Sequence, residues 1–190
     1  MTTKVSASLL GADVPTTASV AAEAAAAALA GNVKLPGDTV QVAYAETAAN
    51  TVLSTVIPAD NTIPQVTEGT QVLSASITPT SASNFLLVEA MITASELTNV
   101  GDSIIAAVFR DGAANALSSG IVGGMNGGLN NLTSGLALVR FRVLAGSTLS
   151  TTFTVRVGNN VGACTLNATH QNINLGATIL STLTITEIKA

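Results

Sequence analysis

Apolar and polar residues alternate along most of the chain between residues 38 and 190. Alternation with period two is typical of β-strands, because successive side chains point to opposite faces of a sheet. Turn-forming residues separate these stretches, and β-branched residues are frequent within them. The pattern predicts strands over residues 40–44, 71–78, 136–144, 151–157 and 177–188, and two more apolar stretches, 84–93 and 103–110, are also predicted as strands.

These strands predict an all-β fold. Seven or more strands without helical crossovers favour an antiparallel β-sandwich, and a jelly roll in particular. In the first strand Val40, Val42 and Tyr44 share one face, and the aromatic residues fall mostly at inward-facing positions. Ala145–Ser147 is predicted as a hairpin turn between strands 136–144 and 151–157.

Two stretches are predicted as loops. Residues 57–69 contain Pro58, Pro64 and Gly69, and residues 120–135 are rich in glycine and asparagine. A solvated flexible loop usually carries more charge than the second stretch does. We therefore expect residues 120–135 to pack against a neighbouring subunit.

The first 37 residues differ from the rest of the chain. An alanine run, Ala24–Ala28, predicts a helix between Thr16 and Gly31, but such a helix has little apolar surface to bury and would be marginal alone. The sequence therefore predicts two parts: an N-terminal anchoring arm over 1–37 that is ordered on docking, and a β-sandwich domain over 38–190.

Only 9% of the residues are charged, whereas a soluble domain typically has about a quarter. Hydrophobic residues still make up 47%, so permanent assembly is the favoured way for this chain to shield its surface. The longest charge-free windows, 112–139 and 157–186, are interrupted throughout by Gly, Asn, Ser and Thr. We therefore expect a soluble chain without membrane insertion, and Met1–Lys4 does not open a secretory signal.

The net charge of −4 and the absence of tryptophan argue against nucleic-acid binding. Candidate catalytic groups are also few, because the chain has one histidine, His170, and one cysteine, Cys164. A hydrolase that uses both is a hypothesis that needs the fold to bring them together. A buried thiol and a loop histidine are favoured instead, so we expect no enzyme activity, no metal and no cofactor.

Other possible sites have ordinary interpretations. Asp60 and Glu68 flank a turn-rich loop and are candidates for a hard-cation site, but their spacing matches no calcium loop and a plain turn is favoured. Asn131 and Asn167 fit the glycosylation pattern and are interpreted as chance matches. The glycines of 123–128 lack the lysine of a phosphate-binding loop.

The most specific local pattern is Arg140, Arg142 and Arg156, a candidate subunit interface. Arg140 and Arg142 are two residues apart on one predicted strand and so share a face. If Ala145–Ser147 closes a hairpin, Arg156 lies on the same face. These arginines pair either with carboxylates of the same sheet, such as Glu89 or Glu46, or with an acidic patch on a neighbouring subunit.

From residue 40 onward the sequence resembles small virion proteins of tailed bacteriophages of the tail-fibre, head-fibre and capsid-decoration type. The most specific block is Ile57–Thr70, with its Ile-Pro, Thr-Ile-Pro-Gln and Thr-Glu-Gly-Thr elements. Weaker matches lie at Val42–Glu46, Leu73–Pro79, Ala107–Asp111 and Leu183–Ile188. The resemblance implies a jelly roll, usually a homotrimer, exposed on a virus particle.

Physics and resemblance together lead to one hypothesis. The chain is a non-enzymatic structural protein of a phage virion, made in the bacterial cytoplasm, that either clamps the capsid as a decoration protein or contacts the host as a fibre. Its expected partners are its own copies, a major capsid or tail protein, and a host surface glycan. The alternative is a carbohydrate-binding jelly roll, which would need a row of exposed aromatic side chains.

Overall fold

The computed structural model describes residues 34–96, 103–122, 134–169 and 171–190. Residues Pro36–Ala190 form one compact unit, separate from Met1–Leu35. The predicted helix of the N-terminal arm lies outside the described residues and stays a prediction. No helix in the described ranges is long and apolar enough to cross a membrane.

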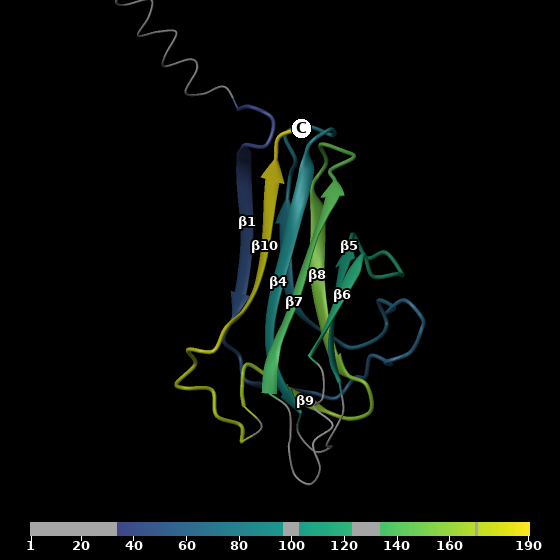
Figure 1. Cartoon of the computed structure of the whole chain (residues 1–190), viewed down its shortest axis with the longest axis vertical. Coiled ribbons are helices and arrows are strands. Elements are labelled where there is room, and N and C mark those ends of the chain that lie inside the picture. The colour runs from purple at the N-terminus through teal and green to yellow at the C-terminus, as the bar shows by residue number, and fades with distance from the viewer. Residues whose placement is uncertain (1–33, 97–102, 123–133, 170) are drawn as a thin grey trace, which may run out of the picture. The chain divides into compact units, whose positions relative to one another are not determined.

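The described residues of the compact unit contain ten β-strands, most of which are labelled in Figure 1. They are β1 (Thr39–Thr47), β2 (Thr51–Leu53), β3 (Thr70–Ile77), β4 (Phe85–Glu96), β5 (Ile104–Arg110), β6 (Ser118–Val122), β7 (Ser134–Leu144), β8 (Thr151–Asn159), β9 (Cys164–Leu166) and β10 (Ser181–Ile188). Seven of the ten coincide with the predicted strands. The three that the sequence did not predict, β2, β6 and β9, have only three to five residues each.

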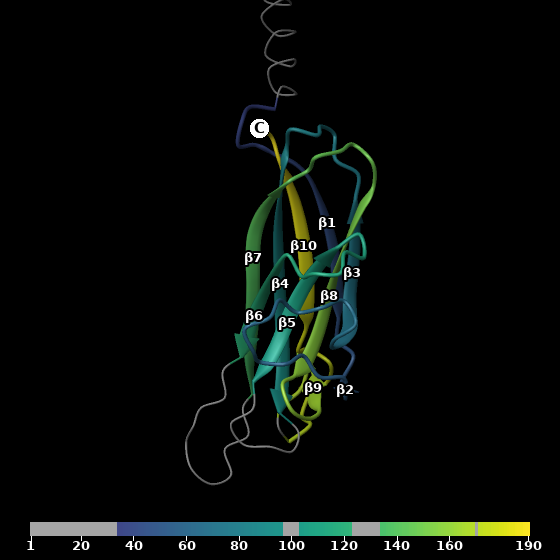
Figure 2. The ribbon, with the colours of Figure 1, turned by 90° about the vertical axis from the view of Figure 1, so that its right-hand side faces the viewer.

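The strands form two antiparallel sheets. A six-stranded sheet has the order β1-β10-β4-β9-β2, with β7 along the other edge of β4, and a four-stranded sheet has the order β3-β8-β5-β6. Figure 2 shows β6, β5, β8 and β3 side by side in that order. Without the short strands β2 and β9, the sheets have the orders β1-β10-β4-β7 and β3-β8-β5-β6, which are those of a jelly roll and confirm the predicted fold class.

The main core lies between the two sheets. The inward residues of β4 are fully buried and face buried residues of β8, among them Phe153 and Val155. β5 is buried on both faces, because Ile105, Ala107 and Phe109 point away from the main core into a second cluster. Ile57 covers that second cluster, so the loop over residues 57–69 is part of the fold.

Two glycines lie at close contacts of this loop. A Cβ on Gly158 would lie 2.6 Å from the carbonyl oxygen of Thr55, and one on Gly69 would lie 2.8 Å from the side chain of Ile57. Gly69 also has a φ of +61°, a conformation that glycine adopts without steric cost. These glycines let residues 55–69 pack directly on the four-stranded sheet.

The predicted hairpin at Ala145–Ser147 is wrong. β7 belongs to the six-stranded sheet and β8 to the four-stranded sheet, so this connection crosses from one sheet to the other. Its backbone N–H groups bond outside the turn: Ala145 donates to the carbonyl of Asn84, and Gly146 donates to that of Ala82. The connection is therefore held by the β3–β4 loop instead of closing on itself.

The predicted shared face of β1 is confirmed for two of its three residues, Val42 and Tyr44. Val42 and Tyr44 share a face, but that face points to solvent, and Ala43 and Ala45 pack against the core. Val40 lies at a register shift between Thr39 and Gln41 and is half-buried. A bulge of this kind adds one residue and interrupts the alternation of the strand.

Candidate functional site

The solvent-facing side of the six-stranded sheet carries more apolar surface than an ordinary exposed sheet. We define the outer face as the outward side chains of its four long strands. They are Val42, Tyr44 and Glu46 of β1, Thr182, Thr184, Thr186 and Ile188 of β10, Phe85, Leu87, Glu89, Met91 and Thr93 of β4, and Leu136, Leu138, Arg140, Arg142 and Leu144 of β7.

Strand register arranges these residues in rows across the sheet. One row runs Tyr44, Thr184, Glu89, Arg140, and the next runs Val42, Thr186, Leu87, Arg142. In each row a threonine of β10 separates the β1 residue from the residues of β4 and β7. The rows therefore place larger side chains toward both edges of the face, with a stripe of threonines between them.

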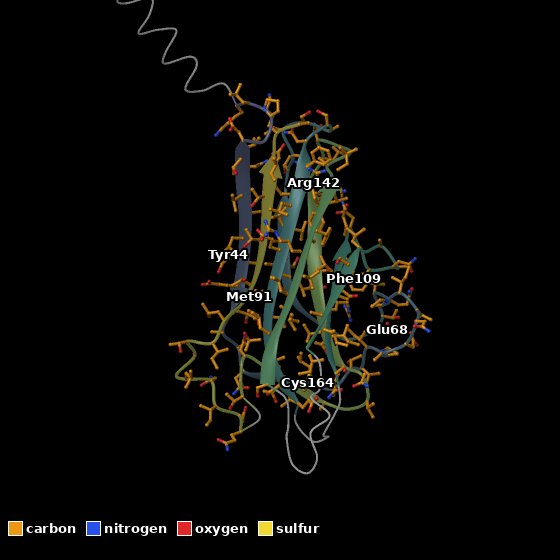
Figure 3. The ribbon with its side chains drawn as sticks, in the orientation of Figure 1. Tyr44, Glu68, Met91, Phe109, Arg142 and Cys164 are labelled. Atoms are coloured by element: carbon orange, nitrogen blue, oxygen red, sulfur yellow. The ribbon has the colours of Figure 1, made fainter. Side chains whose placement is uncertain are left out.

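The apolar residues of the β1 edge of the outer face are Val42 and Tyr44, which are 56% and 54% exposed. The β7 edge carries Leu136, Leu138 and Leu144, and the exposed fraction of Leu138 is 60%. Figure 3 shows Tyr44 on β1 and Arg142 toward the opposite edge of the same sheet. Large apolar side chains are therefore exposed at both edges of one sheet face.

Charged groups on the outer face are few and mostly bonded. Arg140 forms an ion pair with Glu89, with 3.0 Å between Nε and Oε1, which confirms the predicted pairing within the sheet. The guanidinium of Arg142 lies over the ring of Phe85, 4.3 Å from its centre. On β1, the Tyr44 hydroxyl donates to Oε2 of Glu46 at 2.7 Å, and this hydrogen bond raises the pKa of Tyr44.

The structure separates the three arginines of the predicted interface. Arg140 and Arg142 share the outer face, as predicted. Arg156 lies on β8 of the other sheet, so the prediction that it joins them is wrong. Its Nε and Nη2 donate to the carbonyls of Glu68 and Gly69 at 2.7 and 2.8 Å, so Arg156 fastens the end of the 57–69 loop.

The carboxylates of the 57–69 loop hold turns. Asp60 accepts hydrogen bonds from the backbone N–H and the hydroxyl of Thr62, which lower its pKa, and Glu68 accepts one from the backbone of Gln65 at 2.8 Å. Within the described residues, no group of three or more His, Cys, Asp or Glu side chains is placed to hold a metal ion.

The groups of the hydrolase hypothesis are not set up for catalysis by Cys164. This residue lies on β9 with no exposed surface, and burial raises its pKa to about 11. A thiol of that pKa is protonated near neutral pH and is a poor nucleophile. His170 lies outside the described residues.

The remaining candidates also have structural places. Asn167 is buried and donates to the carbonyls of Thr47 and Ala49, so its amide is engaged within the fold. Asn131 lies outside the described residues. A shallow hollow of about 410 Å³ opens between Pro58–Pro64 and the β5–β6 pair, and its one ionisable group is Asp60.

Sequence reasoning missed a buried carboxylate. Glu187 on β10 has no exposed surface and accepts from Gln41 Nε2 at 2.6 Å, from the Thr80 N–H and hydroxyl at 2.8 Å each, and from Asn84 Nδ2 at 2.6 Å. Burial raises the pKa of this carboxyl, but the hydrogen bonds outweigh it and leave the pKa below its usual value. The available signal was its phase, because Glu187 continues the inward positions of Leu183 and Ile185.

The strand order defines the chain as a jelly-roll β-domain, and its sequence places it in a family. The family described as the Pgp3 C-terminal domain matches residues 45–190, from the second half of β1 to the last residue. The chain therefore belongs to the Pgp3 C-terminal domain family. None of the curated proteins compared with the chain matches it.

Several solved structures are similar to the chain at a low level. Eiger TNF from S. frugiperda is 12% identical, with a TM-score of 0.42 over 82% of this chain and 96% of that one. The infectious bursal disease virus Gt strain structure is 18% identical, with a TM-score of 0.36 over 82% of this chain and 39% of that one. The VP2 subviral particle of that virus gives 15% identity and a TM-score of 0.34, over 80% and 39%. Similarity at this level carries no argument about function.

Proposed function

We propose that this chain is a non-catalytic structural β-domain that assembles with copies of itself through the outer face, as a homotrimer exposed on a tailed-phage particle. The observation that carries the proposal is the apolar outer face. Six of its large apolar side chains are more than a third exposed in the single chain. They are Val42, Tyr44, Met91, Leu136, Leu138 and Leu144.

Association would remove this surface from water. Complete burial of a large apolar side chain contributes about 1.5–3 kcal/mol, so covering a half-exposed one contributes about 1 kcal/mol. The low charge of the face helps, because few ions would have to be desolvated when copies meet. The threonines of β10 contribute methyl groups and hydroxyls to the same surface.

The arrangement of the apolar side chains is compatible with a ring of copies. They lie mainly at two different edges, on β1 and on β7, with the threonine stripe between them. A contact between two different patches closes into a ring when the rotation between copies fits, whereas a twofold dimer makes the same contact twice across one axis. The number of copies, three, is taken from the resemblance to trimeric virion proteins.

The phage location is supported by the sequence pattern alone. None of the similar structures given above is a phage protein. In the most specific block, Ile57–Thr70, several residues have structural roles: Ile57 covers the second core, Glu68 caps a turn and Gly69 allows a close approach. The block therefore argues for the fold more strongly than for the location. In the proposal, residues 1–37 anchor the chain to a capsid or tail protein of the virion.

The carbohydrate-binding alternative receives no support from the positions of the aromatic residues. The chain has one tyrosine and four phenylalanines, and Phe109 and Phe153 are fully buried. Tyr44 alone among the five is an exposed large side chain, and Phe85 is partly covered by Arg142. Aromatic platforms for sugars need several exposed rings in one row, which this arrangement does not provide.

Light scattering of the purified full chain tests the assembly. We expect a mass close to three times 18.9 kDa at micromolar concentration, and a folded monomer for Leu138→Asp. The matched control is Leu149→Asp, because Leu149 is 76% exposed outside the outer face and its substitution should leave the trimer intact. A stable wild-type monomer would overturn the proposal. Mass spectrometry of purified phage particles tests the location separately. Absence of the chain from the particles would overturn the phage location and leave the proposed self-assembly unaffected.

A further inference from the structure

Ion pairing among the described residues of the outer face leaves two charged side chains, of opposite sign, without an ion-pair partner. Glu46, Glu89, Arg140 and Arg142 are the four charged members of this face. Glu89 and Arg140 neutralise each other within the chain. Glu46 and Arg142 remain, one on β1 and the other on β7, which are the two opposite edges of the face.

Both remaining groups have bonding capacity to spare. In the described part of the chain, no carboxylate lies within ion-pair distance of Arg142 and no cation lies within that distance of Glu46. Arg142 is held by its stacking on Phe85 and keeps the donors at the rim of its guanidinium. Glu46 uses Oε2 for the Tyr44 hydroxyl, which fixes the carboxylate and leaves Oε1 as an acceptor.

A ring built by the outer face brings these two edges together, since the β1 edge of one copy meets the β7 edge of the next. We propose that Glu46 of one copy forms an ion pair with Arg142 of the neighbouring copy. The inference rests on the proposed self-association and names the charged contact that orients it. Charge pairs of this kind fix the register of an interface more than they add to its affinity.

The pair also sets the stagger between neighbouring copies. Glu46 lies in the row of Met91 and Leu138, two rows from that of Arg142. Two rows correspond to about 14 Å along a strand. The long side chains of Glu46 and Arg142 span part of this distance. Because the copies of a closed ring are related by rotation alone, the strands must be inclined to the ring axis to bring the two rows to the same height.

Charge reversal tests the pair in the full chain. Glu46→Arg and Arg142→Glu each place like charges at the contact, and we expect each to weaken assembly about tenfold or more in a dilution series followed by sedimentation. The double variant E46R/R142E restores opposite charges and should return assembly to within about threefold of wild type. Thr67→Arg is the control, because Thr67 is exposed in the 57–69 loop, away from this sheet.

The outcomes separate this inference from the proposed function. A wild-type monomer overturns both. A wild-type trimer with reversals that change nothing, or with losses that simply add in the double variant, overturns only the ion pair. As a second measurement, E46Q/R142Q should assemble with less dependence on salt than wild type between about 0.05 and 1 M NaCl, because salt screens the pair. Equal salt dependence of the two proteins would also overturn it.

Discussion

Replacing Glu187 by glutamine removes one charge from the interior and changes almost nothing else in volume. The carboxylate divides its four hydrogen bonds unequally: Oε1 accepts from the Thr80 N–H, the Thr80 hydroxyl and Asn84, and Oε2 accepts from Gln41. A glutamine oxygen at the Oε1 position keeps the first three bonds. Its NH₂ group then faces the NH₂ group of Gln41, and two donors cannot bond to each other.

Gln41 cannot resolve this conflict by rotating its amide. Its Nε2 also donates to the carbonyl of Thr78 at 2.6 Å, so a flip would place two oxygens against each other there. The variant therefore loses the charge-assisted hydrogen bond from Gln41. The three hydrogen bonds from Thr80 and Asn84 remain, but they now have a neutral acceptor. A charged partner makes a hydrogen bond worth about 1.5–3 kcal/mol, against about 0.5–1.5 for a neutral one. Removing a buried charge offsets part of this loss, so we expect Glu187→Gln to cost about 2 kcal/mol near pH 7.

The cost should depend on pH in one direction. Because the folded-state pKa of Glu187 is lowered, the carboxylate stabilises the fold above its unfolded-state pKa of about 4.3. This contribution is lost as the pH falls through the lower, folded-state pKa. Glutamine does not titrate, so the stability difference between wild type and variant should shrink as the pH falls from about 5 toward 3.

Urea denaturation of both proteins at equal concentration measures the difference at each pH. Asp60 and Asp111, whose pKa values are also lowered, titrate alike in the two proteins and cancel in the comparison. A variant as stable as wild type at pH 7 would refute the assigned hydrogen-bond network. A stability difference that stays constant down to pH 3 would refute the sign of the pKa shift.

Two further predictions concern the interior. Gly158→Ala should destabilise the fold by about 3 kcal/mol in the same denaturation assay, because its Cβ would meet the backbone of Thr55. The control Gly146→Ala should cost about 1 kcal/mol, because its Cβ meets no atom within 4 Å but its φ is +73°. Equal losses of stability would show that the backbone near Thr55 shifts to make room for the new Cβ. Cys164 should react with a thiol reagent at pH 8 about a hundredfold more slowly in the native chain than in urea, since burial and a pKa of about 11 leave little accessible thiolate; rapid native labelling would contradict its position in the core.

Long strands were predictable from the sequence because each has enough residues for its alternation or its apolar character to show. β8 alternates along most of its length and β4 is a mostly apolar run, and both lie on the main core. β2 and β9 have three residues each, too few for a period of two to stand out. The two pair with each other, and β9 continues the edge of β4 beyond the end of β10. Their positions depend on long-range pairing that no local pattern records.

The same limit explains why only part of the interface prediction held. Spacing along a single strand placed Arg140 and Arg142 together, and this needed no knowledge of the partner strands. Placing Arg156 required knowing whether the 145–147 turn closes a hairpin or crosses between sheets. A short turn with glycine is compatible with both. Here Asn84 and Ala82, some sixty residues earlier in the chain, accept the backbone hydrogen bonds that decide it.

The orientation of β1 connects the fold to the proposed assembly. Pattern reasoning gave Val42 and Tyr44 one shared face, and the structure turns that face to solvent while the small Ala43 and Ala45 pack inward. The inward positions of this edge strand hold alanine, whereas its larger side chains are placed where a single chain gains little from them. Burial against a neighbouring copy would give them the same benefit that inward residues receive from the core. On this argument the larger apolar residues of β1 face a neighbouring copy in the assembled protein. The sequence and structure of a single chain therefore do not identify the face of β1 that assembly buries.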